Sequence, residues 1–138
     1  MRSLTLILLL ISIFNFAKGQ ECSKTFHKTY VPTTDHVVLL DNGKHDIEVL
    51  ETKGSRILVE VTVSTNTSDA VLNALIKAGR YNDILKIEND VDKMNLQFNN
   101  KNSVIFIKGV EIIEIYKLKI FVPNTINVTR KMVGANPR

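Results

Sequence analysis

Polar and apolar positions alternate with a period of two along most of the chain, which predicts strands. The pattern is clearest at 56–65, where one phase is aliphatic and the other is mostly polar. The aliphatic phase consists of Ile57, Val59, Val61 and Val63. Because successive side chains of a strand point to opposite faces, we expect a sheet with one buried face and one wetter face. Similar patterns predict strands at 84–88, 94–98 and 110–122.

One segment follows a helical period instead. Its apolar side chains fall on one helix face and are Val71, Leu72, Leu75 and Ile76. Thr67 or Ser68 can cap the start of such a helix, and Gly79 can end it. We therefore expect a helix at about 69–78 that covers the buried face of the sheet.

Turn residues predict how two of the strands connect. The segment Asp41-Asn42-Gly43-Lys44 separates an apolar run at 37–40 from a second strand at 45–51. Asn-Gly favours the positive φ angles of a tight turn, so the two strands are expected to pair as a β-hairpin.

The long apolar run at 110–122 ends at Pro123 and carries Glu114 within its apolar phase. A β-bulge at 113–115 would accommodate this carboxylate. Because the chain ends soon afterwards, we expect this last strand at a sheet edge. Its unpaired backbone groups would then permit weak self-association.

The first residues have the pattern of a signal peptide. Arg2 supplies positive charge, 4–16 is an almost unbroken apolar run, and Ala17 and Gly19 are the small residues of a cleavage site. The apolar run is about 13 residues long, shorter than the roughly 20 that span a bilayer. We expect cleavage between Gly19 and Gln20, which divides the chain into a signal peptide at 1–19 and a single exported β-rich domain at 20–138. The mature domain would have no transmembrane span and would lie in the periplasm, on the outer cell surface or outside the cell.

Composition narrows the class of protein further. The 138 residues are 44% hydrophobic and 23% charged, which is typical of one globular domain. The net charge of +4 falls to +2 once Arg2 and Lys18 are removed with the signal peptide. Basic and acidic residues alternate rather than gather, which argues against nucleic-acid binding. Cys22, as the lone cysteine, cannot form an internal disulfide and is interpreted as an incidental residue of a loose N-terminal segment.

Three histidines are the main candidates for a chemical site. His27, His36 and His45 could serve a small periplasmic metal-binding protein or enzyme, but they lack closely spaced ligand pairs such as HExxH. Glu111 and Glu114 lie three residues apart, so on a strand they point to opposite faces and are best interpreted as solvated charges. The chain contains no GxSxG, no SxxK and no glycine-rich phosphate loop. We therefore expect no catalytic residue, no cofactor and no metal site.

Three segments together resemble a known family. They are "TDHVVLLDNGKHDIEVLETKGSRILVEVTVS", "SDAVLNALIKAG" and "IYKLKIFVPNTINVT". After a signal peptide, this order is similar to the start of the putative-adhesin family of exported bacterial proteins, relatives of the head domain of supposed auto-transporter adhesins in the Bacteroidetes. The family pattern "yxixVPxxxxv" corresponds here to Tyr116, Leu118, Ile120, Val122, Pro123 and Val128.

The resemblance implies a β-sandwich or a short β-solenoid-like stack of antiparallel strands, and it brings no catalytic residue. Together with the periodicity, it predicts a mainly β protein with one short helix. The predicted function is a non-enzymatic, exported, adhesin-like binding or cell-envelope module whose partner is an envelope protein or a glycan. The alternative is the periplasmic metal-binding protein or enzyme that uses the three histidines.

Overall fold

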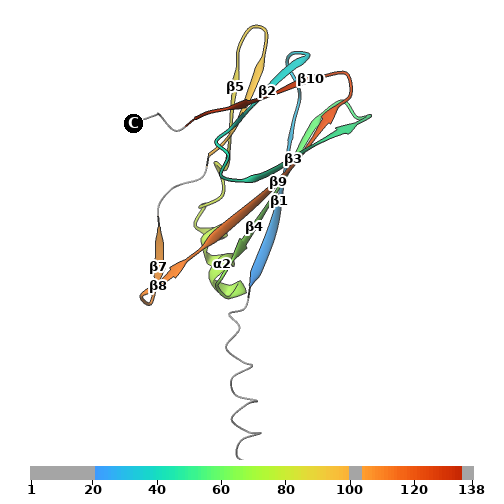
Figure 1. The fold of residues 1–138 in the computed structure, drawn as a ribbon. Coiled ribbons are helices and arrows are strands. Elements are labelled where there is room, and N and C mark those ends of the chain that lie inside the picture. The colour runs from blue at the N-terminus through green and yellow to red at the C-terminus, as the bar shows by residue number, and fades with distance from the viewer. Residues whose placement is uncertain (1–20, 100–103, 135–138) are drawn as a thin grey trace, which may run out of the picture.

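The computed structural model describes residues 21–99 and 104–134, and strands with one helix make up most of them (Figure 1). The strands are β1 (Cys22–Tyr30), β2 (His36–Asp41), β3 (Asp46–Thr52), β4 (Ile57–Thr65), β5 (Leu85–Asn89), β6 (Met94–Phe98), β7 (Ile105–Ile107), β8 (Val110–Ile112), β9 (Glu114–Pro123) and β10 (Asn127–Met132). The helix is α2 (Asp69–Lys77). The prediction of a mainly β fold with one short helix is confirmed. The predicted cleavage site between Gly19 and Gln20 lies outside the described residues.

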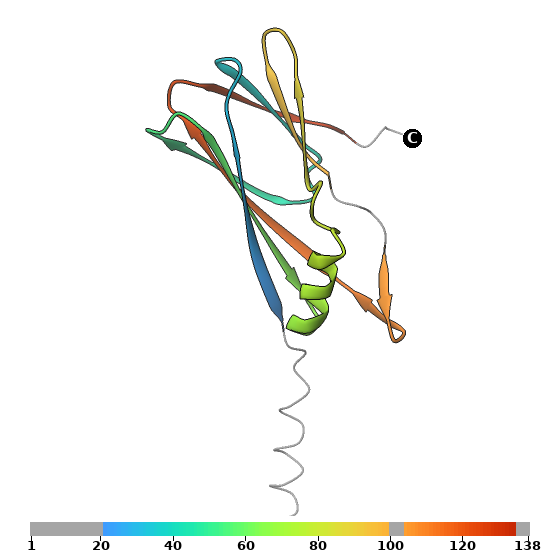
Figure 2. The same cartoon turned by 180° about the vertical axis from the view of Figure 1, so that it is seen from behind.

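Within 21–99 and 104–134, the strands form two four-stranded sheets and one two-stranded hairpin. The first sheet has the order β1-β4-β9-β3, and the second has the order β10-β2-β6-β5. Both are mixed rather than purely antiparallel, because β3 runs parallel to β9 and β2 runs parallel to both of its neighbours. The hairpin β7–β8 stands apart from the two sheets in both views (Figures 1 and 2).

One hydrophobic core joins the inner faces of the two sheets. The predicted alternation in β4 is confirmed, since its inward aliphatic side chains are at most 1% exposed and its other face is half-buried. From the second sheet the core receives Val37, Leu39, Met94, Leu96 and Phe98. Each fully buried side chain of this kind stabilises the fold by about 1.5–3 kcal/mol relative to an exposed one.

Helix α2 forms where its period predicts. The Ser68 hydroxyl accepts a hydrogen bond from the backbone N–H of Val71 at 3.4 Å, and Gly79 follows the helix with a φ of 78°. The helix packs beside β1. Its apolar face is graded, because Leu72 is fully buried while Leu75 and Ile76 are half-buried against the core.

The expected hairpin of β2 and β3 is wrong. The turn is present, with Gly43 at a φ of 72°, but β2 belongs to the second sheet and β3 to the first. The turn residues specify only that the chain reverses direction. Which strand β3 pairs with depends on which neighbouring strand lets it bury its apolar side chains. Here β3 pairs with β9, and the turn carries the chain from one sheet to the other.

An ion pair between a buried carboxylate and a partly exposed arginine links the two sides of this crossing. Asp41 is 2% exposed and accepts hydrogen bonds from Nε and Nη2 of Arg130 at 2.8 and 2.5 Å, and from the backbone N–H of Gly43 at 2.8 Å. Arg130 also donates to the carbonyl of Ile47 at 3.2 Å. Burial alone would raise the pKa of Asp41, but these hydrogen bonds and the Arg130 charge hold it below the ordinary value. One arginine of β10 therefore joins β2 to β3.

The expected edge position of the run at 110–122 is also wrong. β9 lies between β4 and β3, so it is a central strand, and self-association through it is excluded as an edge contact. In place of a bulge, the run breaks at Ile113, which separates β8 from β9. In the two four-stranded sheets, the strands with one partner strand among the described residues are β1 and β3 in the first sheet and β10 and β5 in the second.

Two of these edge strands escaped the sequence prediction. β1 includes Cys22, so this cysteine begins a strand and packs against the core rather than lying in a loose segment. β10 follows Pro123 and is mostly exposed. Both strands are rich in polar residues, and an edge strand with one neighbour buries too little to impose a clear apolar alternation.

Candidate functional site

The most unusual surface of the described residues is apolar. Five large hydrophobic side chains on and beside the β7–β8 hairpin are between 55% and 64% exposed. We call them the apolar hairpin surface: Val104, Phe106, Val110, Ile113 and Ile115. The register pairs Phe106 with Glu111 and Ile107 with Val110, so Phe106 and Val110 lie on opposite faces of the ribbon. Exposed apolar side chains are normal when scattered singly, but their concentration within residues 104–115 is typical of a binding surface.

The hairpin itself has little internal support. Its turn uses positive φ angles at both central residues, Lys108 at 51° and Gly109 at 77°, as a tight two-residue turn requires. Only three residue pairs join the two strands. A two-stranded ribbon is marginally stable on its own in water, so attachment to the body must fix this one in place.

Asn66 supplies part of that attachment. Its side-chain amide donates to the carbonyl of Glu111 at 3.1 Å and accepts from the backbone N–H of Ile113 at 2.9 Å. The amide therefore pins the chain where β8 ends and β9 begins. Beside it is a hollow of about 350 Å³, lined by Glu21, Ser64, Thr65, Asn66, Ile113, Ile115 and Lys117. The apolar hairpin surface thus continues into a recess on the body of the molecule.

Beneath the base of the hairpin lies a buried polar cluster. Arg80 makes a two-pronged contact with Glu114 through Nε at 2.8 Å and Nη2 at 2.6 Å, and the Tyr81 hydroxyl donates to the same carboxylate at 2.6 Å. The two charged side chains are only 13% and 10% exposed. Burial alone would raise the pKa of Glu114, but the hydrogen bonds from Arg80 and Tyr81 and the Arg80 charge hold it below the ordinary value.

The interpretation of Glu114 as a solvated charge is therefore wrong. It faces inward in the same phase as Tyr116 and stays ionised beside Arg80. Glu111 remains exposed on β8. Burial and the Glu114 charge raise the pKa of both Tyr81 and Tyr116, so neither phenol ionises near neutral pH. The cluster is suited to holding the start of β9 in place rather than to transferring protons.

The three histidines have separate surroundings. His27 Nε2 lies 3.3 Å from a carboxylate oxygen of Glu60, and His36 Nε2 lies 3.3 Å from the hydroxyl of Thr129. His45 packs edge-on against the rings of Phe98 and Tyr116, and burial lowers its pKa. Within 21–99 and 104–134, no three His, Cys, Asp or Glu side chains are grouped as a metal ion would require.

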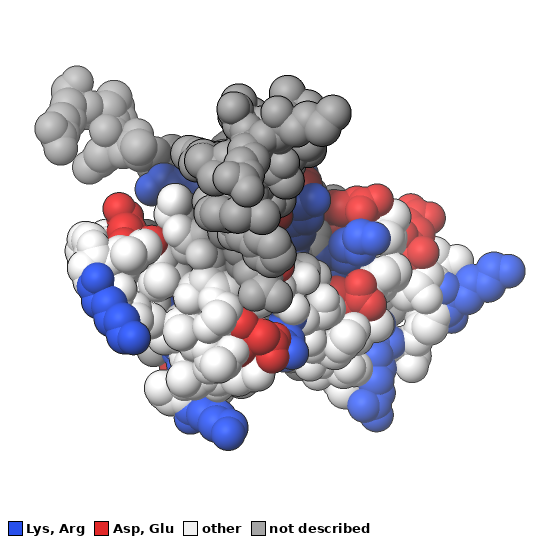
Figure 3. Space-filling model, turned by 90° about the horizontal axis from the view of Figure 1, so that it is seen from below, with Lys and Arg blue, Asp and Glu red and all other residues white. Residues whose placement is uncertain are grey.

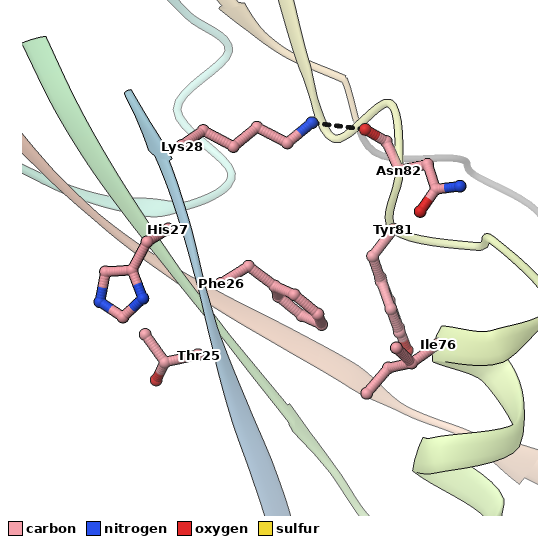
Figure 4. A pocket seen from close by; sticks show the side chains of 7 residues that line it. All are labelled: Thr25, Phe26, His27, Lys28, Ile76, Tyr81 and Asn82. Carbon is pink, nitrogen blue, oxygen red and sulfur yellow. Dashed lines mark hydrogen bonds between the residues drawn. The ribbon is translucent and has the colours of Figure 1, made fainter. Parts of the chain in front are cut away.

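A second hollow, of about 610 Å³, lies along β1 (Figure 4). It is lined by Thr25, Phe26, His27, Lys28, Ile76, Tyr81 and Asn82. The Phe26 and Tyr81 rings approach each other across it at 5.6 Å between centroids, and Lys28 Nζ donates to the carbonyl of Asn82 at 2.5 Å.

Charge on the surface is mixed. On the face seen in Figure 3, Lys and Arg side chains are interspersed with Asp and Glu side chains, and no broad basic area forms. This agrees with the alternation of charge along the sequence. In the part of the chain that the structure describes, no helix has the length and hydropathy needed to cross a membrane.

Comparisons with known proteins add one likeness. A comparison with models of protein families finds no match, and a comparison with curated proteins finds none. Among solved structures, the fold is similar to the crystal structure of a "putative adhesin" from Bacteroides fragilis, at 12% sequence identity and a TM-score of 0.39. The match covers 80% of this chain and 41% of the other, so the chain spans less than half the length of that protein.

Sequence reasoning missed the residues that build this site. Arg80 and Asn66 act through contacts to residues 34 and 47 positions away, which no local pattern reveals. The apolar hairpin surface did leave a signal, because the chain is continuously apolar at 104–107. Such a run fits either a strand buried on both faces or one that exposes an apolar face, and only the tertiary arrangement distinguishes the two.

Proposed function

We propose that the chain is an exported, non-enzymatic, adhesin-like binding module whose apolar hairpin surface docks onto a protein of the cell envelope. The observation that carries this proposal is the group of exposed apolar side chains on a hairpin that is held at its base by Asn66. Burial of such a group against a partner is favourable by roughly 25 cal/mol for each Å² of apolar surface removed from water. Export is supported by the signal-peptide pattern of the first residues.

The chemistry of the surface favours a protein partner over a glycan. Four of its five side chains are aliphatic, and Phe106 is its one aromatic ring. Glycan sites need closely spaced polar groups for the many sugar hydroxyls, whereas an aliphatic patch complements another apolar protein surface.

The non-enzymatic part of the proposal is supported by how the candidate groups are engaged. The Glu114 carboxylate is held by Arg80 and Tyr81 in the buried cluster. The three histidines contact different elements of the fold. A general acid or base needs a position within hydrogen-bond reach of a substrate, which the enclosed Glu114 carboxylate does not offer.

Docking is tested by a pull-down. The mature chain, beginning at Gln20, is fixed on a resin and incubated with an envelope extract of the native host. We expect one envelope protein to be retained by the wild type and lost when Phe106→Ser and Val110→Ser are combined. Val91→Ser is the matched control, because Val91 is fully exposed on the β5–β6 turn and lies outside the apolar hairpin surface. Retention of the same proteins by all three chains would exclude the hairpin as the docking surface.

Export is tested separately by mass spectrometry of the protein from its native host. We expect the N-terminus at Gln20. Recovery of a chain that still begins at Met1 in the cytosol would contradict export without bearing on the hairpin.

A further inference from the structure

The two outer strands of the first sheet carry opposite charge. β1 contains Lys24, His27 and Lys28 and no acidic residue, whereas β3 contains Asp46, Glu48 and Glu51 and no basic residue. These strands lie at the two ends of the order β1-β4-β9-β3. One edge of the sheet is therefore basic and the other acidic.

The solvent face of the sheet extends this difference into an ordered row. The strand registers place His27 beside Glu60, Glu60 beside Lys119, and Lys119 beside Glu48. The first of these pairs is in contact, with His27 Nε2 at 3.3 Å from Glu60 Oε1. The row alternates in charge character across the four strands, and it begins with a histidine at one edge and ends with a carboxylate at the other.

The outer edge of β3 presents backbone groups to the outside. The carbonyl of Thr52 accepts from the N–H of Asn124, just past the end of β9, so Thr52 and the residues in its phase face β9. The carbonyl of Ile47 is in the opposite phase and accepts from Arg130. Val49 and Glu51 share the phase of Ile47, and their side chains are exposed. Their N–H and C=O groups therefore lie along the free side of the strand.

The outer edge of β1 is open along the hollow seen in Figure 4. Four consecutive residues, Thr25 to Lys28, line this hollow. Successive side chains of a strand point to opposite faces, so what all four share is the edge of the strand. The opposite wall of the hollow comes from α2 and the segment after it, through Ile76, Tyr81 and Asn82.

We propose that copies of the mature chain assemble head to tail, with β3 of one copy adding to β1 of the next. β4 is antiparallel to both β1 and β9, and β3 is parallel to β9, so β1 and β3 run in the same direction. A copy translated across the sheet thus adds β3 to β1 as a parallel pair. Glu48 then meets His27 of the next copy, which continues the alternating row.

The same charges favour the β3–β1 pairing over a β1–β1 or a β3–β3 pairing. Two β1 edges paired antiparallel about Phe26 would place Lys24 opposite Lys28, and two β3 edges would bring only carboxylates together. Like charges directly opposed in a sheet are destabilising. A contact between two different edges does not close on itself, so it generates a growing chain of copies rather than a dimer.

A charge exchange tests the proposal by sedimentation velocity over a concentration series. One variant makes the acidic edge basic with Glu48→Lys and Glu51→Lys. The other makes the basic edge acidic with Lys28→Glu and Thr29→Glu. Each alone opposes like charges and should associate at least about tenfold more weakly than the wild type. An equimolar mixture restores both complementary contacts and should recover the wild-type mass distribution.

The wild type should grow past the dimer as its concentration rises, and its association should weaken between about 0.05 and about 0.5 M salt, because salt screens the contacts. A wild type that stays monomeric to about 1 mM or stops at a dimer overturns the proposal. If both variants melt at the wild-type temperature and their mixture stays monomeric, the proposal is also overturned. The salt series needs no substitution, so it decides the matter even if a variant fails to fold.

Discussion

Strand β4 and the apolar hairpin surface are made of similar residues and have opposite surroundings. The inward aliphatic side chains of β4 are at most 1% exposed, while those of the hairpin surface are between 55% and 64% exposed. β4 has a neighbouring strand on each side and a second sheet facing it, whereas among the described residues β7 and β8 pair only with each other. An apolar pattern therefore predicts burial only where another element lies opposite, and among the described residues no second sheet faces the hairpin.

The largest expected effect concerns the buried cluster at the junction of these two regions. Arg80→Met leaves the Glu114 carboxylate buried without its charge partner, which typically costs about 3–5 kcal/mol. Urea denaturation followed by circular dichroism measures this loss. Adding Glu114→Gln should return part of the stability, because it removes the uncompensated charge. Equal stability of the single and double variants would show that the carboxylate is not the source of the cost.

The graded face of α2 allows a sharper test of the core. Leu72 is fully buried, so Leu72→Ala should cost about 2–5 kcal/mol. Leu75 is half-buried, and Leu75→Ala should cost clearly less, since fewer contacts are lost and less of a cavity remains. The two urea midpoints are compared at an unchanged m-value. A larger loss for Leu75→Ala would contradict the packing of the helix described above.

The crossing between the sheets and the buried cluster around Glu114 should both make stability depend on pH. Burial lowers the pKa of His45 below 6.5, so the unfolded chain binds more protons as the pH falls from about 6.5. Stability should therefore decline with falling pH from that point. It should decline again as the pH falls through the lowered pKa values of Glu114 and Asp41, below their ordinary 4.5 and 3.8. Urea midpoints of the wild type and of His45→Gln over this pH range test the assignment. The decline below about pH 6.5 should disappear in the variant, and the decline at lower pH should remain.

The smallest effect on stability is expected on the hairpin surface. Phe106 is 64% exposed, so Phe106→Ser should change the free energy of unfolding by no more than about 0.5 kcal/mol. Binding of a dye that detects exposed apolar surface should fall in the same variant. A loss of stability as large as that of Leu72→Ala would place Phe106 in the core and remove the contrast between the two regions.

Periodicity predicted the elements better than their pairing. The alternation in β4 and the helical spacing of α2 are local properties, and both predictions are confirmed. The partner of β3 is not a local property, because Asp41-Asn42-Gly43-Lys44 describes a turn that serves equally well within one sheet or between two. At this crossing, Arg130 of β10 links Asp41 to the Ile47 carbonyl from 89 residues away in the sequence, which no local pattern reveals.

The candidate site was still less predictable. Glu114 interrupted an apolar phase, which correctly marked its position as unusual, but its partner Arg80 lies beyond the end of α2 and carries no motif. The charges of β1 and β3 are visible in the sequence, whereas their location on opposite edges of one sheet depends on the order of its strands.

The strand order also sets when the chain can finish folding. The two sheets are interleaved along the sequence, and β9, which joins β4 to β3, is complete only at Pro123. β2 can pair with β6 earlier, but it gains its second neighbour only with β10, from Asn127 onward. Pairings between such distant segments require large loops to close, which slows folding. The first sheet therefore lacks its central strand until residue 123 has been synthesised, and the second sheet lacks β10 until residue 132.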